Sequence, residues 1–486
     1  MSQATTTDLY EASMALSYLR EGMTEDATFS LFVRDLPPNR GFLVSAGLEP
    51  VLDFLTDFCV TANDARDFAA ALGRPPHEAE PLVGLGFEGE VRAVPEGRIV
   101  LSGEPLLEVT APLPQAQLVE TWLLSQVSHQ TTVATKAARC VLASAGRPVV
   151  DFSLRRGHGP EAGMQAARVG SMVGFAGTSN VAAALRWKTP ASGTMAHSYI
   201  EAFGDEEAAF MAFARSRAGP ITLLVDTYDT VEGVVTAARV LNALHRGPGS
   251  AIRLDSGDLA ELARRSRTVL DRAGLPDVGI IASGGLDEFR IEDLVRSGAP
   301  IDVYAVGTKV GTSSDAPYLD SAYKLVEYDG RPVMKLSAAK VTAPGRKQVL
   351  RAEGGADDVI ALAEEDVPGG REPLLQTVMS AGRRTRTRDT LAAAHDRFVG
   401  DLAALPQRTR RIRHPEAPVP TVSAQLSALT SDVRQHLERG VEQRRGGRAG
   451  SQNWDLPGAL RTAEHPKLAN GQAEGGTRAP ESGHRR

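Results

Sequence analysis

The 486-residue sequence contains only two cysteines, Cys59 and Cys140, and no Cys-x-x-Cys pair. Two separate thiols are too few for a disulfide framework or a cysteine zinc cluster. The sequence also has no uninterrupted apolar run of about 18 residues, so we expect no transmembrane helix. Its first residues show neither the basic region nor the apolar region of a secretory signal. These absences predict a cytoplasmic protein with no membrane partner.

Three motifs of nucleotide and metal chemistry are missing as well. The sequence has no Walker A motif, no His-Glu-x-x-His and no dinucleotide-binding Gly-x-Gly-x-x-Gly directly after a first strand. A nucleotide, if the protein binds one, must therefore be held in another way. The sequence does not indicate which residues would be metal ligands.

Charge is unevenly distributed along the chain. The formal net charge is −6, but residues 439–486 hold nine Lys or Arg and five Asp or Glu, which leaves the rest of the chain near −10. A mildly acidic body argues against nucleic acid as the main partner. Gly, Arg, Gln and Pro dominate the last part of the chain, and no apolar periodicity survives past about Leu437. We therefore expect residues 441–486 to be disordered.

The most regular feature of the sequence is a short apolar run that ends abruptly in polar or glycine residues and is followed by an amphipathic helix. The clearest runs cover residues 221–226, 251–255, 278–283 and 301–308. Strands separated by enough chain for a crossover helix run parallel, so this alternation predicts an α/β fold. If the strands close into a barrel, their carboxyl ends share one rim, where side chains can meet a substrate.

The segments on either side of this α/β region have a different character. Residues 84–113 carry Gly and Pro every few positions between short alternating runs, which predicts a small antiparallel β unit. A helical stretch from about residue 114 to 143 follows and is expected to link that unit to the barrel. Residues 323–336 predict a hairpin around Asp329-Gly330.

Polar and glycine residues follow the predicted parallel strands directly. Glycine loops leave backbone N–H groups unshielded, so an anion can approach them closely, and such loops late in a barrel are typical phosphate sites. The residues that this reasoning places on the rim are Asp226, Asp255, Ser283, Gly284, Gly285, Gly307 and Thr308.

His197 is the leading catalytic candidate. It follows the Gly193-Thr194 turn and precedes a helix-like run. A neutral imidazole close to a strand-end carboxylate such as Asp226 can be oriented and made more nucleophilic, which suits general base catalysis or transient phosphorylation. The alternative is an ordinary core or surface histidine.

Arginines near the strand exits complete the predicted site. Arg155, Arg156 and Arg253 offer planar donors for a carboxylate or a diphosphate. Asp255 could hold ribose hydroxyls, whereas Asp258 is equally suited to cap the helix that begins at Leu259. Together these residues indicate a site for two anionic substrates, one of them phosphorylated.

Several separate motifs, in this order along the chain, resemble those of the nicotinate phosphoribosyltransferase family over about residues 7–440. The motifs are Thr-Asp-Leu-Tyr10, Phe-Val-Arg-Asp-Leu-Pro-Pro-Asn-Arg-Gly41, Gly-Thr-Ser-Asn180, Gly-Thr-Met-Ala-His-Ser198, Arg-Leu-Asp-Ser-Gly-Asp-Leu259, Ala-Ser-Gly-Gly-Leu-Asp287, Val-Gly-Thr308 and Pro-Gly-Arg-Lys-Gln348. The resemblance implies a type II phosphoribosyltransferase with an irregular, TIM-like α/β barrel beside an α/β sandwich domain that the C-terminal segment completes. It also implies a homodimer with the site near the subunit interface. The expected parts are the sandwich domain with its linking helix at 1–146, the barrel at 147–322, a C-terminal segment packing on both at 323–440 and the tail at 441–486.

The reaction implied by this resemblance is the first step of NAD salvage from nicotinate. Nicotinate and phosphoribosyl diphosphate would give nicotinate mononucleotide and diphosphate, with Mg²⁺ and with ATP as a coupled co-substrate. ATP would phosphorylate His197. The remaining roles implied are nicotinate contacts at Tyr10, Thr194 and Arg253, a phosphoribosyl contact at Thr308 and, from the related nicotinamide enzymes, pyridine and ribose contacts at Arg155 and Asp255.

The strand exit at Thr178 and Ser179 is expected to bind the substrate and to set specificity. The related nicotinamide enzymes carry Asp at the position of Ser179, and a carboxylate there would repel nicotinate. The loop around His158 departs from the family pattern, and we assign that histidine no role. Nicotinamide or quinolinate phosphoribosyl transfer on the same fold is the nearest alternative. A non-catalytic barrel subunit is another, but it predicts loss of His197 or Arg253, and both are present.

Overall fold

The computed structural model describes residues 3–336, 342–355 and 357–448, with side chains through residue 443. Contacts divide the chain into one unit that ends at Arg434 and a second that begins at Gln435. The helices are α1 (Leu9–Arg20), α2 (Leu48–Asp57), α3 (Ala62–Ala71), η1 (Pro76–Leu82), α4 (Leu113–Leu118), α5 (Glu120–Ala143), η2 (Leu154–Arg156), α6 (Pro160–Met172), α7 (Val181–Trp187), α8 (His197–Phe203), α9 (Glu206–Arg215), α10 (Thr230–Ala243), α11 (Leu259–Arg272), α12 (Glu288–Arg296), α13 (Thr308–Gly311), α14 (Leu391–Ala404) and α15 (Ala424–Arg448).

A seven-stranded antiparallel sheet brings together segments from both ends of the first unit. Its strand order is β13-β12-β1-β5-β3-β17-β18, so strands from beyond residue 320 flank strands from the first 112 residues. This confirms that the C-terminal segment completes the N-terminal domain. The strands are β1 (Asp26–Val33), β3 (Glu90–Ala93), β5 (Pro105–Pro112), β12 (Ser321–Tyr328), β13 (Arg331–Pro332), β17 (Gln376–Ser380) and β18 (Arg383–Arg384).

The predicted parallel strands form a second sheet of six strands in the order β7-β6-β11-β10-β9-β8. All five pairings are parallel, which confirms the α/β alternation. The sheet is curled but open, with β7 and β8 at its edges, so the irregular barrel is a half-barrel. The strands are β6 (Val149–Asp151), β7 (Gly177–Thr178), β8 (Thr222–Leu224), β9 (Ala251–Leu254), β10 (Gly279–Ala282) and β11 (Val303–Val306).

Aspartates place the helices of the half-barrel behind its rim. Asp229, Asp258 and Asp287 are the N-caps of α10, α11 and α12, and each side chain accepts backbone N–H groups of the first turn. The capping alternative for Asp258 is therefore confirmed. Because each cap lies only a few residues after its strand, the rim loops are short and closely positioned.

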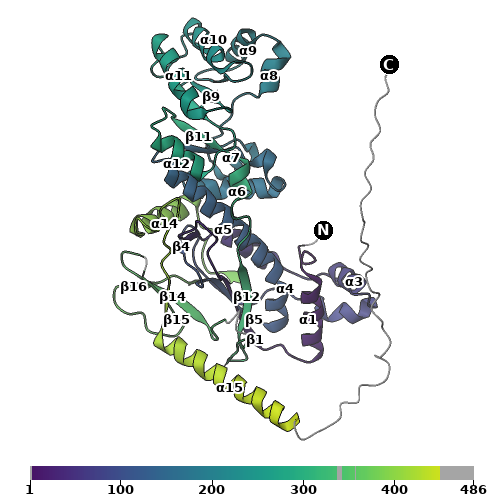
Figure 1. Cartoon of the computed structure of the whole chain (residues 1–486). Helices are drawn as coiled ribbons and strands as arrows, with labels where there is room; N and C mark the ends of the chain where they lie inside the picture. Colours follow the sequence, from purple (N-terminus) through teal and green to yellow (C-terminus); the bar gives the residue numbers. More distant parts are fainter. Residues whose placement is uncertain (1–2, 337–341, 356, 449–486) are drawn as a thin grey trace, which may run out of the picture. The chain divides into compact units, whose positions relative to one another are not determined.

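Helix α5 joins the two hydrophobic cores of the first unit. Leu123 and Val127 pack in the core under the antiparallel sheet, whereas Val133 and Ala137 pack in the core of the half-barrel. In Figure 1 this helix runs from the antiparallel sheet toward β11 and α12. The prediction of a linking helix is confirmed, although Val119 separates the short α4 from α5.

Two small sheets complete the first unit. One pairs β2 with β4, and the other has the order β16-β14-β15-β19. The strands of these two sheets are β2 (Leu43–Val44), β4 (Ile99–Val100), β14 (Lys347–Ala352), β15 (Asp358–Leu362), β16 (Arg371–Pro373) and β19 (Thr421–Val422).

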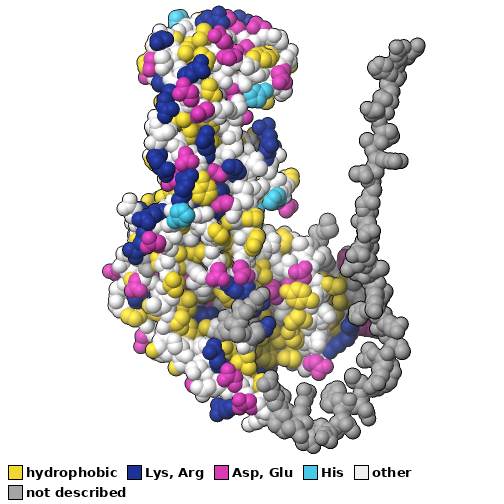
Figure 2. Space-filling model, viewed as in Figure 1, with side chains coloured by type: hydrophobic (Ala, Val, Ile, Leu, Met, Phe, Trp, Pro, Cys, Tyr) yellow, Lys and Arg dark blue, Asp and Glu magenta, His cyan; other side chains and the backbone are white. Residues whose placement is uncertain are grey.

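Charges of both signs are mixed on the surface. In Figure 2, Lys and Arg side chains are interspersed with Asp and Glu over the face in view.

Some predictions about the elements need correction. The sequence of residues 173–180 predicts a short strand, but β7 spans only Gly177–Thr178, because residues 173–175 complete the turn after α6. Helix α15 runs through Arg448, so the first part of the expected disordered tail is helical, and the rest of the tail lies outside the described residues. The predicted hairpin is confirmed, since Asp329 and Gly330 both have positive φ angles between β12 and β13. The four-part division of the chain remains a prediction.

Candidate active site

The carboxyl ends of four neighbouring strands form one polar rim. Asp226, Asp255, Ser283 and Gly307 follow β8, β9, β10 and β11 within two residues of each strand end. A hollow of about 630 Å³ and a smaller one of about 230 Å³ open beside them, and Arg155, Arg156 and Arg253 are among the residues that line both. The rim predicted from the strand exits is therefore a real concave site.

His197 is the first residue of α8 and lines the larger hollow. Its Nδ1 lies 3.1 Å from Oγ1 of Thr227. Its Nε2 faces two carboxylates, with Asp226 Oδ1 at 3.9 Å and Asp255 Oδ2 at 4.0 Å. The ring is 38% exposed, so it can react with a molecule in the hollow while protein groups orient it.

The carboxylate of Asp226 is held rigidly below the histidine. Its side chain is only 1% exposed, and Oδ2 accepts hydrogen bonds from the Asp255 backbone N–H at 2.9 Å and the Ser256 hydroxyl at 2.6 Å. Oδ1 has no hydrogen-bond partner among the described residues. One oxygen therefore fixes the carboxylate, and the other remains free for the histidine.

Arg253 lies within β9 rather than at its exit, which corrects the position assumed from the sequence. Its Nε donates to Ser283 Oγ at 2.7 Å and one terminal nitrogen donates to Asp255 Oδ1 at 2.5 Å. The guanidinium also lies 5.4 Å from the centre of the Phe152 ring. These contacts hold its plane at the junction of the two hollows.

Asp255 stays ionised because of its neighbours. Burial alone would raise its pKa, but the hydrogen bond from Ser283 and the charge of Arg253 outweigh burial and hold the pKa below its ordinary value. Asp255 lines both hollows. A carboxylate in this position can accept hydrogen bonds from hydroxyl groups of a bound sugar.

The smaller hollow is lined by the glycine loops. Gly284 and Gly285 both have positive φ angles, and a Cβ on Gly284 would lie 1.8 Å from the carbonyl oxygen of Asp255. Gly307 and Thr308 also line this hollow. Bare backbone beside Arg155 and Arg253 is the chemistry that a phosphate or diphosphate group needs.

The structure separates the roles of Thr178 and Ser179. Ser179 is exposed and lines the larger hollow. The alternative role for Ser179, capping the helix that follows it, belongs to Asn180, which is the N-cap of α7. Thr178 is 1% exposed and its hydroxyl donates to Asp151 Oδ2 at 2.7 Å, so it points away from the hollow. The prediction that Thr178 contacts a substrate directly therefore needs correction.

Thr194 and Tyr10 lie in very different places. Thr194 lines the larger hollow, and its hydroxyl donates to the Thr222 carbonyl at 2.9 Å. Tyr10 lies on α1 in the N-terminal domain, is 47% exposed and is not among the residues that line either hollow. Burial and the nearby Glu120 raise its pKa. One copy of the chain does not bring Tyr10 to His197.

Acidic residues near the histidine do not form a closed metal site. Burial and the carboxylates of Asp205 and Asp226 raise the pKa of Glu206 to about 7, so this group is partly protonated near neutral pH. Within the described residues, no group of three or more His, Cys, Asp or Glu could hold a metal ion.

Four residues of the site were missed by sequence reasoning: Asp151, Phe152, Met195 and Thr227. Phe152 lies under Arg253, Asp151 anchors Thr178, and the Met195 carbonyl lies 3.5 Å from Arg253. Thr227 directly follows Asp226, so its place at a strand exit was the available signal.

Together, the open half-barrel and the two adjoining rim hollows define an α/β enzyme that binds anionic small molecules at the carboxyl edge of a parallel sheet. Comparison with known proteins gives the family. Residues 5–128 match the nicotinate phosphoribosyltransferase (NAPRTase) N-terminal domain, and residues 148–343 match the nicotinate phosphoribosyltransferase (NAPRTase) family. The chain belongs to the nicotinate phosphoribosyltransferase family.

Individual relatives agree with this assignment. Nicotinate phosphoribosyltransferase pncB2 of Mycobacterium tuberculosis is 46% identical over 412 residues, which cover 84% of this chain and 88% of the relative. Nicotinate phosphoribosyltransferase of Bacillus subtilis is 43% identical over 375 residues, covering 74% and 76%. The crystal structure of human nicotinic acid phosphoribosyltransferase superposes with a TM-score of 0.77 at 29% identity, covering 88% of this chain and 99% of the human one. No helix among the described residues has the length and apolar character needed to span a membrane.

Proposed function

We propose that this protein transfers the 5-phosphoribosyl group from phosphoribosyl diphosphate to nicotinate, giving nicotinate mononucleotide and diphosphate, as the first step of NAD salvage from nicotinate. The observation that carries the proposal is the pair of hollows joined at Arg253. One hollow contains His197 and Ser179, and the other is lined by glycine loops suited to phosphate.

The arrangement of the two hollows supports the following roles for their residues. The carboxylate of nicotinate would lie near Arg155 and Arg253, the ribose hydroxyls near Asp255, and the phosphate groups against Gly284 and Thr308. The pyridine nitrogen forms a bond to C1 of the ribose as the bond from C1 to the diphosphate oxygen breaks. Holding both substrates in adjoining hollows supplies the alignment that this displacement requires.

ATP is the proposed co-substrate, with His197 as the group that it phosphorylates. Two carboxylates within 4.0 Å of Nε2 would stabilise the positive charge that a phosphorylated ring acquires. His197→Ala should abolish the ATP-stimulated part of the rate and leave the fold unchanged. Mapping of acid-labile label from γ-labelled ATP tests this, and label on another residue would contradict it.

Magnesium fits the site as part of a substrate complex. Mg²⁺ is commonly bound by substrate phosphates, waters and one or two carboxylates rather than by an all-protein cage. Asp255 is the carboxylate among the residues that line the two hollows. The ion would neutralise charge on the leaving diphosphate.

A homodimer would explain the position of Tyr10. This residue is expected to contact nicotinate, yet it lies outside both hollows of its own chain. We therefore propose that Tyr10 serves the site of a second copy, and that the protein is a cytoplasmic homodimer. Mixing Tyr10→Ala and His197→Ala proteins under subunit exchange should restore part of the ATP-stimulated rate, because one site of each mixed dimer would be intact. No recovery despite a confirmed dimer would exclude this arrangement.

A single assay separates the proposed reaction from its alternatives. Nicotinate, nicotinamide and quinolinate are offered separately with phosphoribosyl diphosphate, with and without ATP, and the products are identified by mass. We expect nicotinate mononucleotide from nicotinate. Product from nicotinamide or quinolinate alone would overturn the assignment of substrate, and no product from any of the three would favour a non-catalytic subunit.

A further inference from the structure

The smaller hollow has two walls that come from different strands. One wall is the loop after β10, with Gly284 and Gly285, and the other follows β11, with Gly307 and Thr308. Three of these four residues are glycines, which have no side chain that could fix the distance between the walls. A diphosphate group that binds here is contacted from both walls, so their separation decides how well it is held.

Each wall is followed closely in the sequence by a carboxylate. Glu288 comes three residues after Gly285, is the first residue of α12 and is fully buried. On the other side, Thr308 begins α13, and backbone hydrogen bonds fold residues 308–316 into consecutive turns that include Asp315. Because both connections are short, a carboxylate that is held in place also holds its wall.

Lys136 lies on α5, and its buried ammonium group joins the two carboxylates. Its Nζ donates to Asp315 Oδ1 at 2.6 Å and forms an ion pair with Glu288, and its side chain is 0% exposed. Helix α5 packs against both α12 and α13, so the bridge is built on a helix rather than on a loop. Lys309 also pairs with Asp287 at 2.8 Å and links the two walls, but its side chain is 42% exposed and water screens that contact. Lys136 is therefore the stronger link between the walls.

Two buried arginines pair with the same carboxylates one at a time. Arg139 Nε donates to Glu288 Oε1 at 2.9 Å, and Arg40 donates to both oxygens of Asp315 at 2.9 and 3.1 Å but lies 3.7 Å from Glu288. Burial would raise the pKa of Asp315, but the hydrogen bonds and charges of Arg40 and Lys136 outweigh burial and hold the pKa well below its ordinary value, so this carboxylate is ionised at neutral pH. Without Lys136, each carboxylate would still have a cation, and only the bridge between them would be lost.

We propose that Lys136 is a positioning residue for phosphoribosyl transfer, and that it holds the two walls of the smaller hollow at the separation that the phosphate groups of phosphoribosyl diphosphate require. This inference rests on the proposed function, which puts those groups in the smaller hollow. Lys136 is not among the residues that line either hollow, so it acts through Glu288 and Asp315. Its loss should weaken the binding of phosphoribosyl diphosphate and leave the binding of nicotinate in the larger hollow nearly unchanged.

Three substitutions separate the bridge from the stability of the cluster. Lys136→Met removes the ammonium group and keeps a long side chain, and since Arg40 and Arg139 still pair with the carboxylates, no buried charge is left without a partner. Arg139→Met is the matched control, because it removes a comparably buried cation from Glu288 and leaves the bridge intact. Asp315→Asn breaks the other end of the bridge at a side chain that is 26% exposed, so it tests the same link at a smaller cost in stability. Thermal unfolding of each variant establishes that the fold is retained.

The measurements are the KM values for phosphoribosyl diphosphate and for nicotinate, each with the other substrate and ATP at saturation. Lys136→Met and Asp315→Asn should each raise the KM for phosphoribosyl diphosphate roughly 10- to 100-fold and change the KM for nicotinate little. The double variant should be no worse than Lys136→Met alone, because both changes break the same bridge. Arg139→Met should lower the unfolding temperature and leave both KM values nearly unchanged. Calorimetric titration with inorganic diphosphate, which needs no turnover, should show the same order among the variants.

The contrary results separate this inference from the proposed function. If the unmodified protein makes no nicotinate mononucleotide, the proposed function fails and the role of Lys136 fails with it. If the unmodified protein is active, an unchanged KM for phosphoribosyl diphosphate in Lys136→Met, or an equal rise of both KM values, would overturn the role of Lys136 alone. A selective rise of the KM for phosphoribosyl diphosphate in Arg139→Met as large as that in Lys136→Met would also overturn it, because any loss of charge from the cluster would then disturb the hollow.

Discussion

Arg253 is the residue on which the two hollows depend most. Its guanidinium donates to Ser283 and Asp255 at once, which the single ammonium group of lysine cannot do in the same plane. We expect Arg253→Lys to weaken nicotinate binding by about 1.5–3 kcal/mol, the size of a lost charge-assisted hydrogen bond. Steady-state KM values for nicotinate check this. Equal losses for nicotinate and for an analogue without the carboxylate would show that Arg253 serves the diphosphate.

Ser179 is the residue that should decide between an acid and an amide substrate. It is exposed in the larger hollow, and the helix-capping role that could have explained it belongs to Asn180. Ser179→Asp should shift preference from nicotinate toward nicotinamide, because a carboxylate repels the acid and accepts a hydrogen bond from the amide. The test is the ratio of kcat/KM for the two pyridines in both proteins. An unchanged ratio would remove Ser179 from the specificity pocket.

Among individual residues, the sequence predicted those that directly follow strands. It missed those that act by holding a neighbouring residue in place. Asp255 and Ser283 stood out because a short apolar run ended at each of them. Thr178 looked the same in the sequence, but only the structure shows its hydroxyl turned to Asp151. Strand periodicity indicates which residues reach the rim, whereas the direction of a side chain depends on partners distant in sequence.

In the loop between β10 and α12, the effect of a steric clash can be separated from the effect of backbone strain. A Cβ on Gly284 would lie 1.8 Å from the Asp255 carbonyl, whereas one on Gly285 would meet nothing within 4 Å. Both residues have positive φ angles, so alanine strains the backbone at both positions, and the steric clash belongs to Gly284 alone. Gly284→Ala should therefore raise the KM for phosphoribosyl diphosphate at least about tenfold more than Gly285→Ala, because the clash costs more than about 1.4 kcal/mol. Similar losses in both variants would mean that backbone strain, and not close approach to β9, limits this loop.

Helix α1 should make stability depend on pH. Burial raises the pKa of Glu11 to about 7, although hydrogen bonds from Thr121 and Thr7 partly oppose this. Since the folded pKa lies above the ordinary value of 4.5, the folded state binds the proton more tightly. Its contribution to stability is complete below pH 4.5 and is lost as the pH rises toward 7. Glu11→Gln should reduce the fall in urea midpoint between pH 5 and pH 8, and an unchanged pH dependence would assign the effect to other groups.

The type and order of the elements were largely predictable, whereas their extent was not. The parallel strands 251–254 and 279–282 were found because β-branched runs ended at turn residues, and the hairpin at Asp329-Gly330 because of its turn chemistry. The strand predicted within residues 173–180 has only two residues in the structure, because residues 173–175 complete the turn after α6. The pattern of apolar residues indicates which residues are buried, but the backbone hydrogen-bond partners decide where a strand begins.

Across the whole first unit, buried charges connect the N-terminal domain to the half-barrel. Lys136 of α5 is fully buried and contacts both Glu288, the first residue of α12, and Asp315. Arg40, from the N-terminal domain, donates to Asp315 at 2.9 and 3.1 Å. Glu288 lies only three residues after Gly285, so this cluster helps to position the glycine loop between β10 and α12. None of this was visible in the sequence, because the partners are separated by more than 100 residues.

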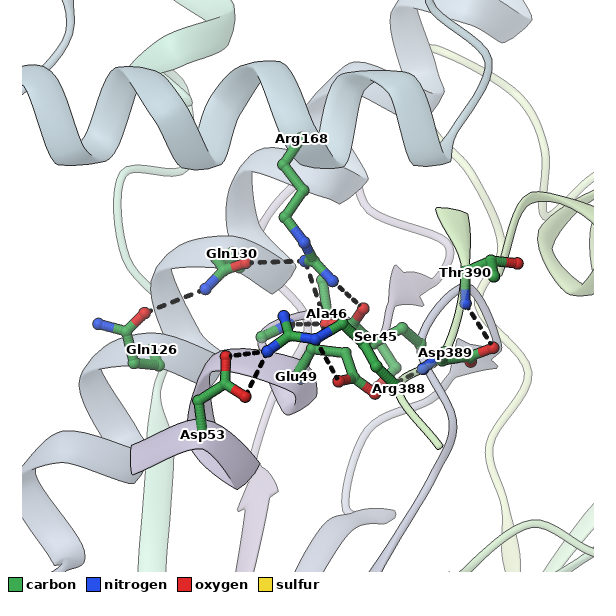
Figure 3. Close-up of polar contacts among 12 residues, drawn as sticks. Ser45, Ala46, Glu49, Asp53, Gln126, Gln130, Arg168, Arg388, Asp389 and Thr390 are labelled. Atoms are coloured by element: carbon green, nitrogen blue, oxygen red, sulfur yellow. Dashed lines mark hydrogen bonds and ion pairs between the residues drawn. The ribbon is translucent and has the colours of Figure 1, made fainter. Parts of the chain in front are cut away.

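A second buried ion pair, between Arg168 and Glu96, tests how the two domains are held together. Figure 3 shows the Arg168 side chain pointing toward Gln130. Arg168 of α6 donates to Gln130 Oε1 at 3.1 Å and to Glu96 Oε1 at 3.2 Å, while Glu96 also accepts the Gly47 backbone N–H at 2.8 Å. The same view contains the ion pair between Arg388 and Asp53, whose side chains are 55% and 40% exposed. The two pairs differ mainly in burial, which makes the exposed one a matched control.

Arg168→Met should cost about 3–5 kcal/mol of unfolding free energy, because it leaves the charge of Glu96 buried without its partner. Arg388→Ala should cost about 0–1 kcal/mol, since water screens an exposed pair. The double variant Arg168→Met with Glu96→Gln should recover part of the loss, because it removes both charges and keeps an amide oxygen for the Gly47 N–H. Urea midpoints at pH 7 measure all three, with kcat recorded below the transition. Equal losses for Arg168→Met and Arg388→Ala would show that burial does not set the strength of this contact, and no recovery in the double variant would show that Arg168 acts through its packing or through Gln130 rather than through Glu96.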